Sequence, residues 1–176
     1  MLSVKQLLAT TRATHPQIIA NAKTVRVRFD AVVEREDDDG DVYREVRAIC
    51  RGASIPREVT LKLYGKGSDA LAWVSCTCEW FLYHCEVALW TKFSSDIIHS
   101  NGQNPSITNP RRIGIACKHI ARCFMDGAAS LAPTRKAGKE KATKPDKSAQ
   151  KRMSDSKQTK DTGKPSKPSP FQVKKR

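Results

Sequence analysis

The sequence has no apolar run long enough to cross a membrane and no apolar segment typical of a secretion signal. No stretch approaches the roughly 20 apolar residues that a membrane-spanning helix needs. Residues 1–9 are too short and too polar for a signal peptide. Six cysteines could form disulfides in a secreted protein, but without such a signal a reducing cytoplasm fits better. The first 29 residues lack acids, as transit peptides do. The strand pattern that begins at Thr24 argues against a transit segment of that length.

Familiar catalytic motifs are missing as well. The chain has no glycine-rich phosphate loop, no recognisable order of serine, histidine and acid, and no glutamate placed as a base beside a metal-binding pair. We therefore expect a protein that is not an enzyme. The alternative is an enzyme that uses Cys85 or Cys123 as a nucleophile, which is less favoured because neither has an evident base beside it.

The C-terminal quarter of the chain has almost no large apolar residues before Phe171 and Val173. Residues 131–176 carry fifteen Lys or Arg against four acids, a net charge of +11, whereas residues 1–130 carry only +3. Such a proline-broken stretch cannot bury enough apolar surface to offset the cost of ordering it, so we expect it to be disordered when free. Its charge predicts an arm for nucleic-acid phosphates or an acidic protein surface. The alternative is a solubilising tail with no dedicated partner.

What the sequence does have is two short pairs of metal-binding side chains. Cys76 and Cys78 with Cys117 and His119 offer three thiolates and one imidazole, the donor set of a Cys₃His zinc site. Residues two apart on an extended strand face the same side, so the first pair can share an ion if residues 71–76 form a strand. Residues two apart on a helix diverge, so the second pair can converge only where the chain begins a helix. With four protein ligands the zinc would be closed and structural.

The other cysteines and histidines allow rival ligand sets. Cys123 lies four residues after His119 on the same helical face and is the strongest rival. Cys85, in an expected helix from Glu79 to Trp90, is either a core residue or a substitute ligand. Cys50 is expected to be a core residue, and His84 and His99 are expected to be surface or core residues.

Changes in hydrophobic period predict an α+β fold with a small antiparallel sheet of two hairpins. Residues 3–9 and 16–22 have helical spacing, with Pro16 in a first turn. Alternation from Thr24 and again over residues 42–50 predicts one hairpin, with the acidic run of residues 34–41 at its tip. Residues 59–63 and 71–76 predict a second hairpin, which delivers the first cysteine pair. The expected helices pack on this sheet around the zinc site.

The composition divides the chain into three expected parts. Residues 1–57 hold the helical segment and first hairpin, residues 58–130 the zinc module, and residues 131–176 the basic tail. Residues 91–112 read as loop, and Arg111 and Arg112 just before the second pair are candidate phosphate or carboxylate contacts, or simply a solvated basic loop.

The C-x-C and C-x-H order resembles the SWIM zinc finger, a small ββα-type module found in transposases, chromatin proteins and many bacterial, archaeal and phage proteins. The resemblance covers roughly residues 58–128, with residues 71–75 as the approach strand and residues 115–125 as the closing helix. It implies zinc bound by Cys76, Cys78, Cys117 and His119. The 38 residues between the pairs exceed the usual spacer. An insertion is the simplest interpretation, since doubling a loop costs only about 0.6 kcal/mol.

Residues 76–89 and 107–110, with the long spacer, are also similar to SWIM proteins carried by tailed bacteriophages, some of them virion components. We therefore expect a non-enzymatic, zinc-stabilised binding and assembly protein, cytoplasmic or part of a virion, with virion proteins among its partners. The alternative is a DNA- or RNA-binding zinc-finger protein that acts through its basic tail.

Overall fold

The computed structural model describes residues 1–52, 55–133 and 135–136. The tail expected to be disordered falls largely outside these residues, so its order and its contacts stay predictions. In chain order the elements are β1 (Leu2–Ser3), α1 (Val4–Thr14), α2 (Pro16–Ala22), β2 (Arg26–Glu36), β3 (Val42–Arg51), β4 (Arg57–Tyr64), the 3-10 turn η1 (Gly67–Asp69), β5 (Leu71–Cys76), α3 (Glu79–His84), α4 (Glu86–Trp90), α5 (Lys118–Met125), the 3-10 turn η2 (Ala128–Ser130) and β6 (Arg135–Lys136).

The strands form one sheet in the order β1-β5-β4-β3-β2-β6. All neighbours are antiparallel except β2 and β6, which are parallel. The expected α+β class and both expected hairpins, β2–β3 and β4–β5, are confirmed. The two hairpins are joined by direct pairing of β3 with β4, so the sheet runs without a break past residue 57.

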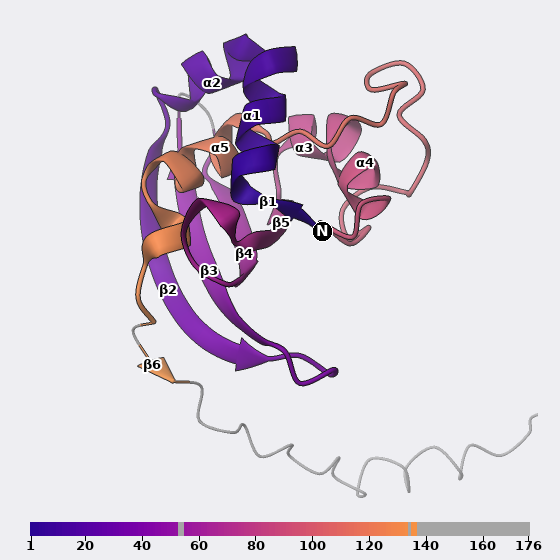
Figure 1. Ribbon diagram of the computed structural model, residues 1–176. Coiled ribbons are helices and arrows are strands. Elements are labelled where there is room, and N and C mark those ends of the chain that lie inside the picture. The colour runs from indigo at the N-terminus through magenta and orange to yellow at the C-terminus, as the bar shows by residue number, and fades with distance from the viewer. Residues whose placement is uncertain (53–54, 134, 137–176) are drawn as a thin grey trace, which may run out of the picture. The chain divides into compact units, whose positions relative to one another are not determined.

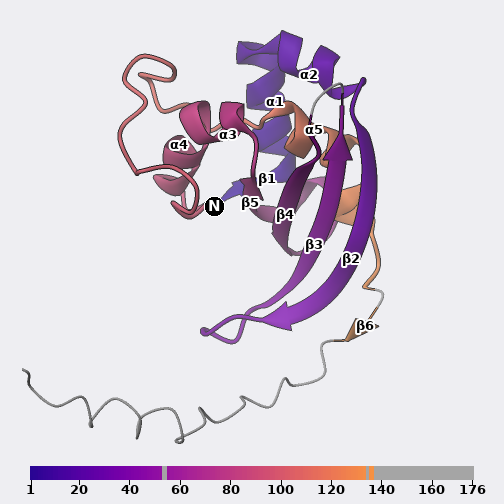
Figure 2. The same cartoon turned by 180° about the vertical axis from the view of Figure 1, so that it is seen from behind.

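One face of the sheet is covered by helices and the other is not. Figures 1 and 2 show α1, α2 and α5 over the same face, and Figure 2 shows β2 to β5 from the opposite side with no helix of the described residues in front of them. Alternation along the strands sends apolar side chains toward the helices, as it should in a sheet with one buried face. The core between sheet and helices includes Leu7, Val46, Leu61, Val74 and Ile120.

The first two helices follow from local signals in the sequence. Ser3 and Gln6 form a capping box at the start of α1, in which each side chain accepts a hydrogen bond from the other residue's backbone N–H. Pro16 occupies the first turn of α2, where its missing N–H costs nothing. One or two short helices were expected here, and the structure has two, although α1 continues to Thr14 rather than ending at Ala9.

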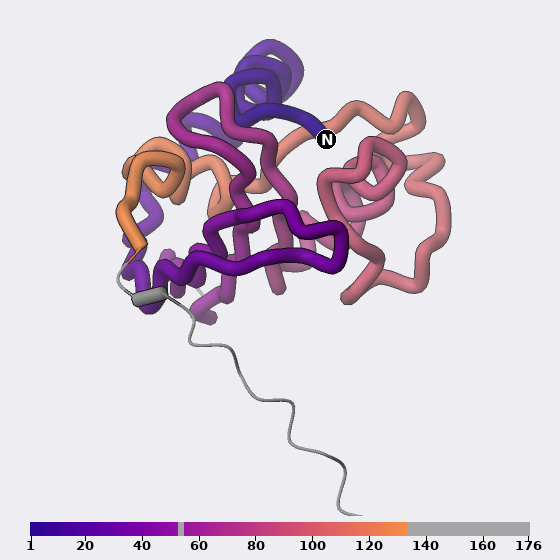
Figure 3. The backbone as a smooth tube through the Cα atoms, turned by 60° about the horizontal axis from the view of Figure 1, so that its bottom comes forward, coloured from indigo at the N-terminus to yellow at the C-terminus, as the bar shows by residue number. Residues whose placement is uncertain are grey.

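The single helix expected from Glu79 to Trp90 is wrong, because the chain forms two short helices that meet at Cys85. The break places Glu86 at the start of α4, fully buried, where its carboxylate reaches backbone N–H groups of the following loop. Figure 3 shows α3, α4 and the loop that follows them beyond β5, on the side away from β2, whereas the segment with η2 lies toward β2.

No helix of the described residues is long and apolar enough to span a lipid bilayer.

Candidate metal centre

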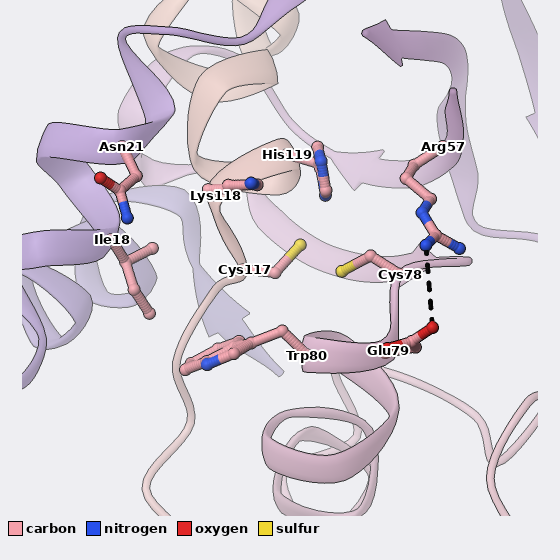
Figure 4. A pocket seen from close by; sticks show the side chains of 9 residues that line it. All are labelled: Ile18, Asn21, Arg57, Cys78, Glu79, Trp80, Cys117, Lys118 and His119. Carbon is pink, nitrogen blue, oxygen red and sulfur yellow. Dashed lines mark ion pairs between the residues drawn. The ribbon is translucent and has the colours of Figure 1, made fainter. Parts of the chain in front are cut away.

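Four side chains from distant parts of the chain meet in one buried cluster. The thiols of Cys76, Cys78 and Cys117 and the imidazole of His119 place their donor atoms within 4.8 Å of one another. All four residues are buried, with exposed fractions of 5% or less. Figure 4 shows three of them, Cys78, Cys117 and His119, turned toward a common point between β5, α3 and α5. The structure therefore brings together the four residues that the sequence singled out, and the group could hold a metal ion.

The first pair is placed by the end of a regular strand. β5 ends at Cys76, and the next residue continues the ladder, because the backbone N–H of Thr77 donates to the carbonyl of Glu58 at 3.1 Å. The Thr77 hydroxyl in turn accepts from the Glu58 N–H at 3.0 Å. Cys78 then caps α3, and its sulfur accepts from the backbone N–H of Phe81 at 3.3 Å. A sulfur held in this way is favoured as a thiolate, since the donor points at developing negative charge.

The second pair lies where a loop becomes a helix. Cys117 is extended, with φ −74° and ψ 167°, and α5 begins at Lys118 rather than at the expected Ile115. The later start is what allows convergence, because two residues both inside a helix would diverge. The imidazole of His119 points inward, with Nδ1 3.8 Å from the sulfur of Cys76.

Side-chain contacts hold the irregular segment that leads to Cys117. Asn109 is buried, and its amide donates to the carbonyls of His84 and Ile113 while its oxygen accepts from the Ile113 N–H. The hydroxyl of Thr11, on α1, accepts from the Ala116 N–H at 2.8 Å. These bonds fix the backbone immediately before the cluster.

Gly114 lies in a closely packed part of this segment. A Cβ at this position would lie 2.6 Å from Cδ1 of Leu2 and 3.0 Å from Cδ of Lys92. No side chain fits at the lower distance without movement, so glycine lets the loop pass directly against β1.

A buried carboxylate anchors the start of the same long loop. Glu86 accepts hydrogen bonds from the backbone N–H groups of Ile98, His99 and Ser100, at 3.1, 3.0 and 2.7 Å. Burial raises the pKa of Glu86, but the hydrogen bonds from Ser100, His99 and Ile98 outweigh it, and the pKa lies below its usual value. The carboxylate therefore stays charged and holds three donors of an otherwise irregular loop.

The thiols of the cluster do not share their protons equally. Hydrogen bonds from Cys117 and Cys76 hold the pKa of Cys78 far below its usual value, whereas hydrogen bonds with Cys117 and Cys78, together with burial, raise the pKa of Cys76. Burial likewise raises the pKa of Cys117. One thiolate stabilised by two thiols is the state that protein groups alone support. A bound cation would favour thiolate at all three positions, because the metal ligand is the deprotonated sulfur.

The rival ligand candidates, Cys123 and Cys85, lie outside the four-residue cluster. The sulfur of Cys123 lies 3.6 Å from that of Cys50, and Cys50 contacts the backbone carbonyl of His119 rather than its ring. Cys85 is fully buried at the junction of α3 and α4, and burial raises its pKa. Two other histidines, His84 and His99, have their own contacts. His84 stacks on Trp80 with ring centroids 4.3 Å apart, and His99 contacts the Ser75 hydroxyl at 3.3 Å.

A cavity of about 260 Å³ opens beside the cluster. Its walls include Ile18 and Asn21 of α2, the ring of Trp80, and two cations, Arg57 and Lys118, as Figure 4 shows. Arg57 donates to the carbonyl of Thr77 at 3.0 Å and lies 4.0 Å from the carboxylate of Glu79. The cations lie where they would offset the negative charge of metal-bound thiolates.

The supporting residues were harder to find in the sequence than the ligands. Asn109 lay in a loop signal, Thr11 lay between the two segments with helical spacing, and Glu86 looked like an ordinary polar position on the expected helix from Glu79 to Trp90. No sequence signal marked them, since their partners are backbone groups that become neighbours only after folding. Arg111 and Arg112 remain exposed, and Arg112 donates to the Asn104 side chain at 3.0 Å.

Neither a protein-family model nor a curated protein nor a solved structure matches this chain in the three comparisons. The function has to be argued from the cluster and from the surfaces around it.

Proposed function

We propose that this chain is a zinc-stabilised, non-enzymatic binding and assembly protein. The observation that carries the proposal is the buried group of Cys76, Cys78, Cys117 and His119, with its donor atoms within 4.8 Å of one another. Tetrahedral zinc with a Zn–S bond of about 2.3 Å and a Zn–N bond of about 2.0 Å places a sulfur and a nitrogen ligand roughly 3.5 Å apart. The Cys76 sulfur and His119 Nδ1 lie 3.8 Å apart, close to that spacing.

The donor set also favours zinc and a structural role. Three sulfurs and one imidazole nitrogen are soft and borderline ligands, which suit zinc better than magnesium or calcium. Four protein ligands leave no position for a reactive water, so the ion would stabilise the fold rather than catalyse a reaction. The C-x-C and C-x-H order supports placing the module with SWIM-type zinc fingers.

The setting that we propose is a virion or a comparable protein assembly. It is supported by the similarity of residues 76–89 and 107–110 to proteins of tailed phages, and by a chain whose net charge of +14 lies mostly in residues 131–176. That charge favours a second candidate function, in which the tail binds nucleic acid.

Metal content is the direct test of the zinc proposal. Elemental analysis of the full chain, purified without added metal, should give one zinc per chain. A folded protein that contains no metal would contradict the proposal. The matched pair of variants is Cys117→Ser, which removes a donor, and Cys123→Ser, which changes a buried sulfur outside the cluster. Only the first should lose zinc.

The tail is tested by removing it. The chain should be cut after Lys139, because Leu131 accepts a hydrogen bond from Arg44 and β6 pairs with β2. If the tail is the arm, the shortened chain should lose most nucleic-acid affinity and most of its salt dependence. If neither form binds nucleic acid but the tail is needed for association with a protein assembly, the assembly function stands and the second candidate falls.

A further inference from the structure

The uncovered side of the sheet carries an ordered set of polar and aromatic side chains, here called the outer face. Register pairs Arg26 with Arg51, and the next row toward the hairpin tip holds Arg28, Ile49 and Glu58. Ala31, Arg47 and Thr60 form the row after that. Two more rows follow. They are Val33–Glu45–Lys62–Trp73, and Arg35–Tyr43 beside Tyr64–Leu71. Along each strand these residues alternate with those that face the core, so their side chains point away from the helices.

The charge of the outer face is unlike that of the rest of the folded part. It has six cations, Arg26, Arg28, Arg35, Arg47, Arg51 and Lys62, against three acids, Asp30, Glu45 and Glu58. This +3 equals the net charge of residues 1–130 as a whole, so the remaining residues of that range sum to zero. The positive charge is therefore concentrated on this one face.

Two of the arginines have no carboxylate partner among the described residues. Arg26 and Arg51 are exposed and directly opposite each other on neighbouring strands, and the ion pairs of this face involve Arg28, Arg35 and Arg47 instead. Like charges opposite each other destabilise a sheet. A polyanion bound across both guanidiniums would relieve that repulsion.

Aromatic rings lie in the two rows of the same face nearest the hairpin tip. Trp73 and Tyr64 are half-buried, and the ammonium of Lys62 lies 4.5 Å from the centre of the Trp73 ring. Rings beside cations on an open surface suit single-stranded nucleic acid, whose unpaired bases stack on aromatics while its phosphates meet the cations. A duplex hides those base faces.

The two ends of the face differ in charge. The hairpin tip beyond Tyr64 holds Glu36, Asp37, Asp38, Asp39 and Asp41 and would repel phosphates. The arginine rows lie at the opposite end. β6, the start of the basic tail, pairs in parallel with β2 at Val33 and Glu34, in the half of β2 nearer the hairpin tip.

We propose that the outer face binds single-stranded nucleic acid, with phosphates on Arg26, Arg28, Arg47 and Arg51 and a base against Trp73 or Tyr64. The site goes beyond the proposed function, because it uses neither the metal cluster nor the tail beyond residue 136. Its arginines act as bidentate phosphate ligands, which is the contact that a guanidinium favours.

The test measures binding of the full chain to a fluorescent oligothymidine by anisotropy across a range of salt. Replacing Arg26 and Arg51 together by alanine should weaken binding on the order of tenfold and reduce the salt slope by about 1.4, since each phosphate contact in a single strand contributes about 0.7. The control is Lys5→Ala with Arg12→Ala, which removes equal charge from exposed positions on α1, across the sheet. Equal effects of the two double variants would overturn the site.

A second measurement separates the face from the tail and from the metal. Ultraviolet cross-linking to an oligonucleotide containing iodouracil should mark Trp73 or Tyr64, and cross-links confined to residues 137–176 would overturn the proposal. Zinc content is measured for each variant, so failure of the metal cluster is detected separately.

Polyglutamate serves as a second ligand that mimics an acidic protein. If the variant with Arg26 and Arg51 replaced keeps oligonucleotide binding but loses binding to polyglutamate, the face recognises an acidic protein instead and the proposal is wrong.

Discussion

The two halves of the metal cluster are built in different ways. Cys76 and Cys78 follow a strand whose backbone is paired along its whole length with β4. Cys117 and His119 follow residues 91–116, which contain no helix or strand. The first pair is thus placed by main-chain hydrogen bonds, and the second by a few side-chain contacts between the loop and α1, α3, α4 and β1. Substitutions around the second pair should therefore lower stability and zinc affinity more than substitutions around the first pair.

Removal of the metal should have the largest effect, because both halves depend on it. Binding free energies of roughly 10 to 16 kcal/mol in small zinc domains exceed the stability of an ordinary domain. A strong chelator should therefore unfold residues 58–128, while the β2–β3 hairpin survives in part. Circular dichroism and the melting temperature report the result. Values unchanged by chelation would contradict a folding role.

Loss of the Asn109 side chain should have the next largest effect. Asn109→Ala removes three hydrogen bonds to backbone groups of the irregular half, at about 1 kcal/mol each. We expect destabilisation of about 3 kcal/mol and a tenfold or greater loss of zinc affinity, as for other groups that orient ligands. Denaturant unfolding measures the change in stability, and competition with a chelator measures the change in zinc affinity. Asn101→Ala, in an exposed part of the same loop, is the control and should change neither.

Gly114→Ala tests close packing of the loop against β1. The added Cβ would overlap Leu2, and overpacking of this kind costs about 1 to 3 kcal/mol. Gly52→Ala is the matched control, since nothing lies within 4 Å of a Cβ there. Combining Gly114→Ala with Leu2→Ala should restore part of the stability lost in the single variant. No restoration would mean that the contact with Leu2 is not the cause.

The anchor at Glu86 should make stability depend on pH. Because its pKa lies below the usual 4.5, the carboxylate contributes fully above that pH, and the contribution is lost as the pH falls through the lowered value. Glu86→Gln should cost about 1 to 2 kcal/mol at neutral pH. The difference between wild type and Glu86→Gln should shrink below pH 4.5, and this comparison cancels the metal release common to both. A difference in stability that stays constant with pH would exclude titration of the Glu86 carboxylate as its cause.

The smallest effect is expected in the regular half. Thr77→Ala removes one hydrogen bond, from the Glu58 N–H, while the main-chain bond between the same residues remains. We expect a cost of about 1 kcal/mol or less and unchanged zinc affinity. A loss as large as that of Asn109→Ala would remove the contrast between the two halves.

The sequence predicted the parts of the molecule that repeat a local pattern. Alternation identified both hairpins, and two C-x-C-like pairs identified the cluster residues, because ligand spacing and strand period are local properties. The pairing of β3 with β4 and the short strand β1 could not be predicted in this way, since each depends on segments brought together by folding. The break at Cys85 was missed for the same reason. The apolar pattern of residues 79–90 continues across it, and the buried carboxylate of Glu86 finds its donors twelve to fourteen residues later.

The position of Ser94 has a consequence for how partners can attach. Its carbonyl accepts a hydrogen bond from the Val74 N–H at 2.9 Å, and β1 pairs with Leu71 and Ala72, so the outer edge of β5 is already occupied. Exposed sheet edges recruit extended peptides from partners and also promote edge-to-edge aggregation. The protein is protected from both along β5, and a peptide that meets it there has to be recognised through side chains rather than by strand addition.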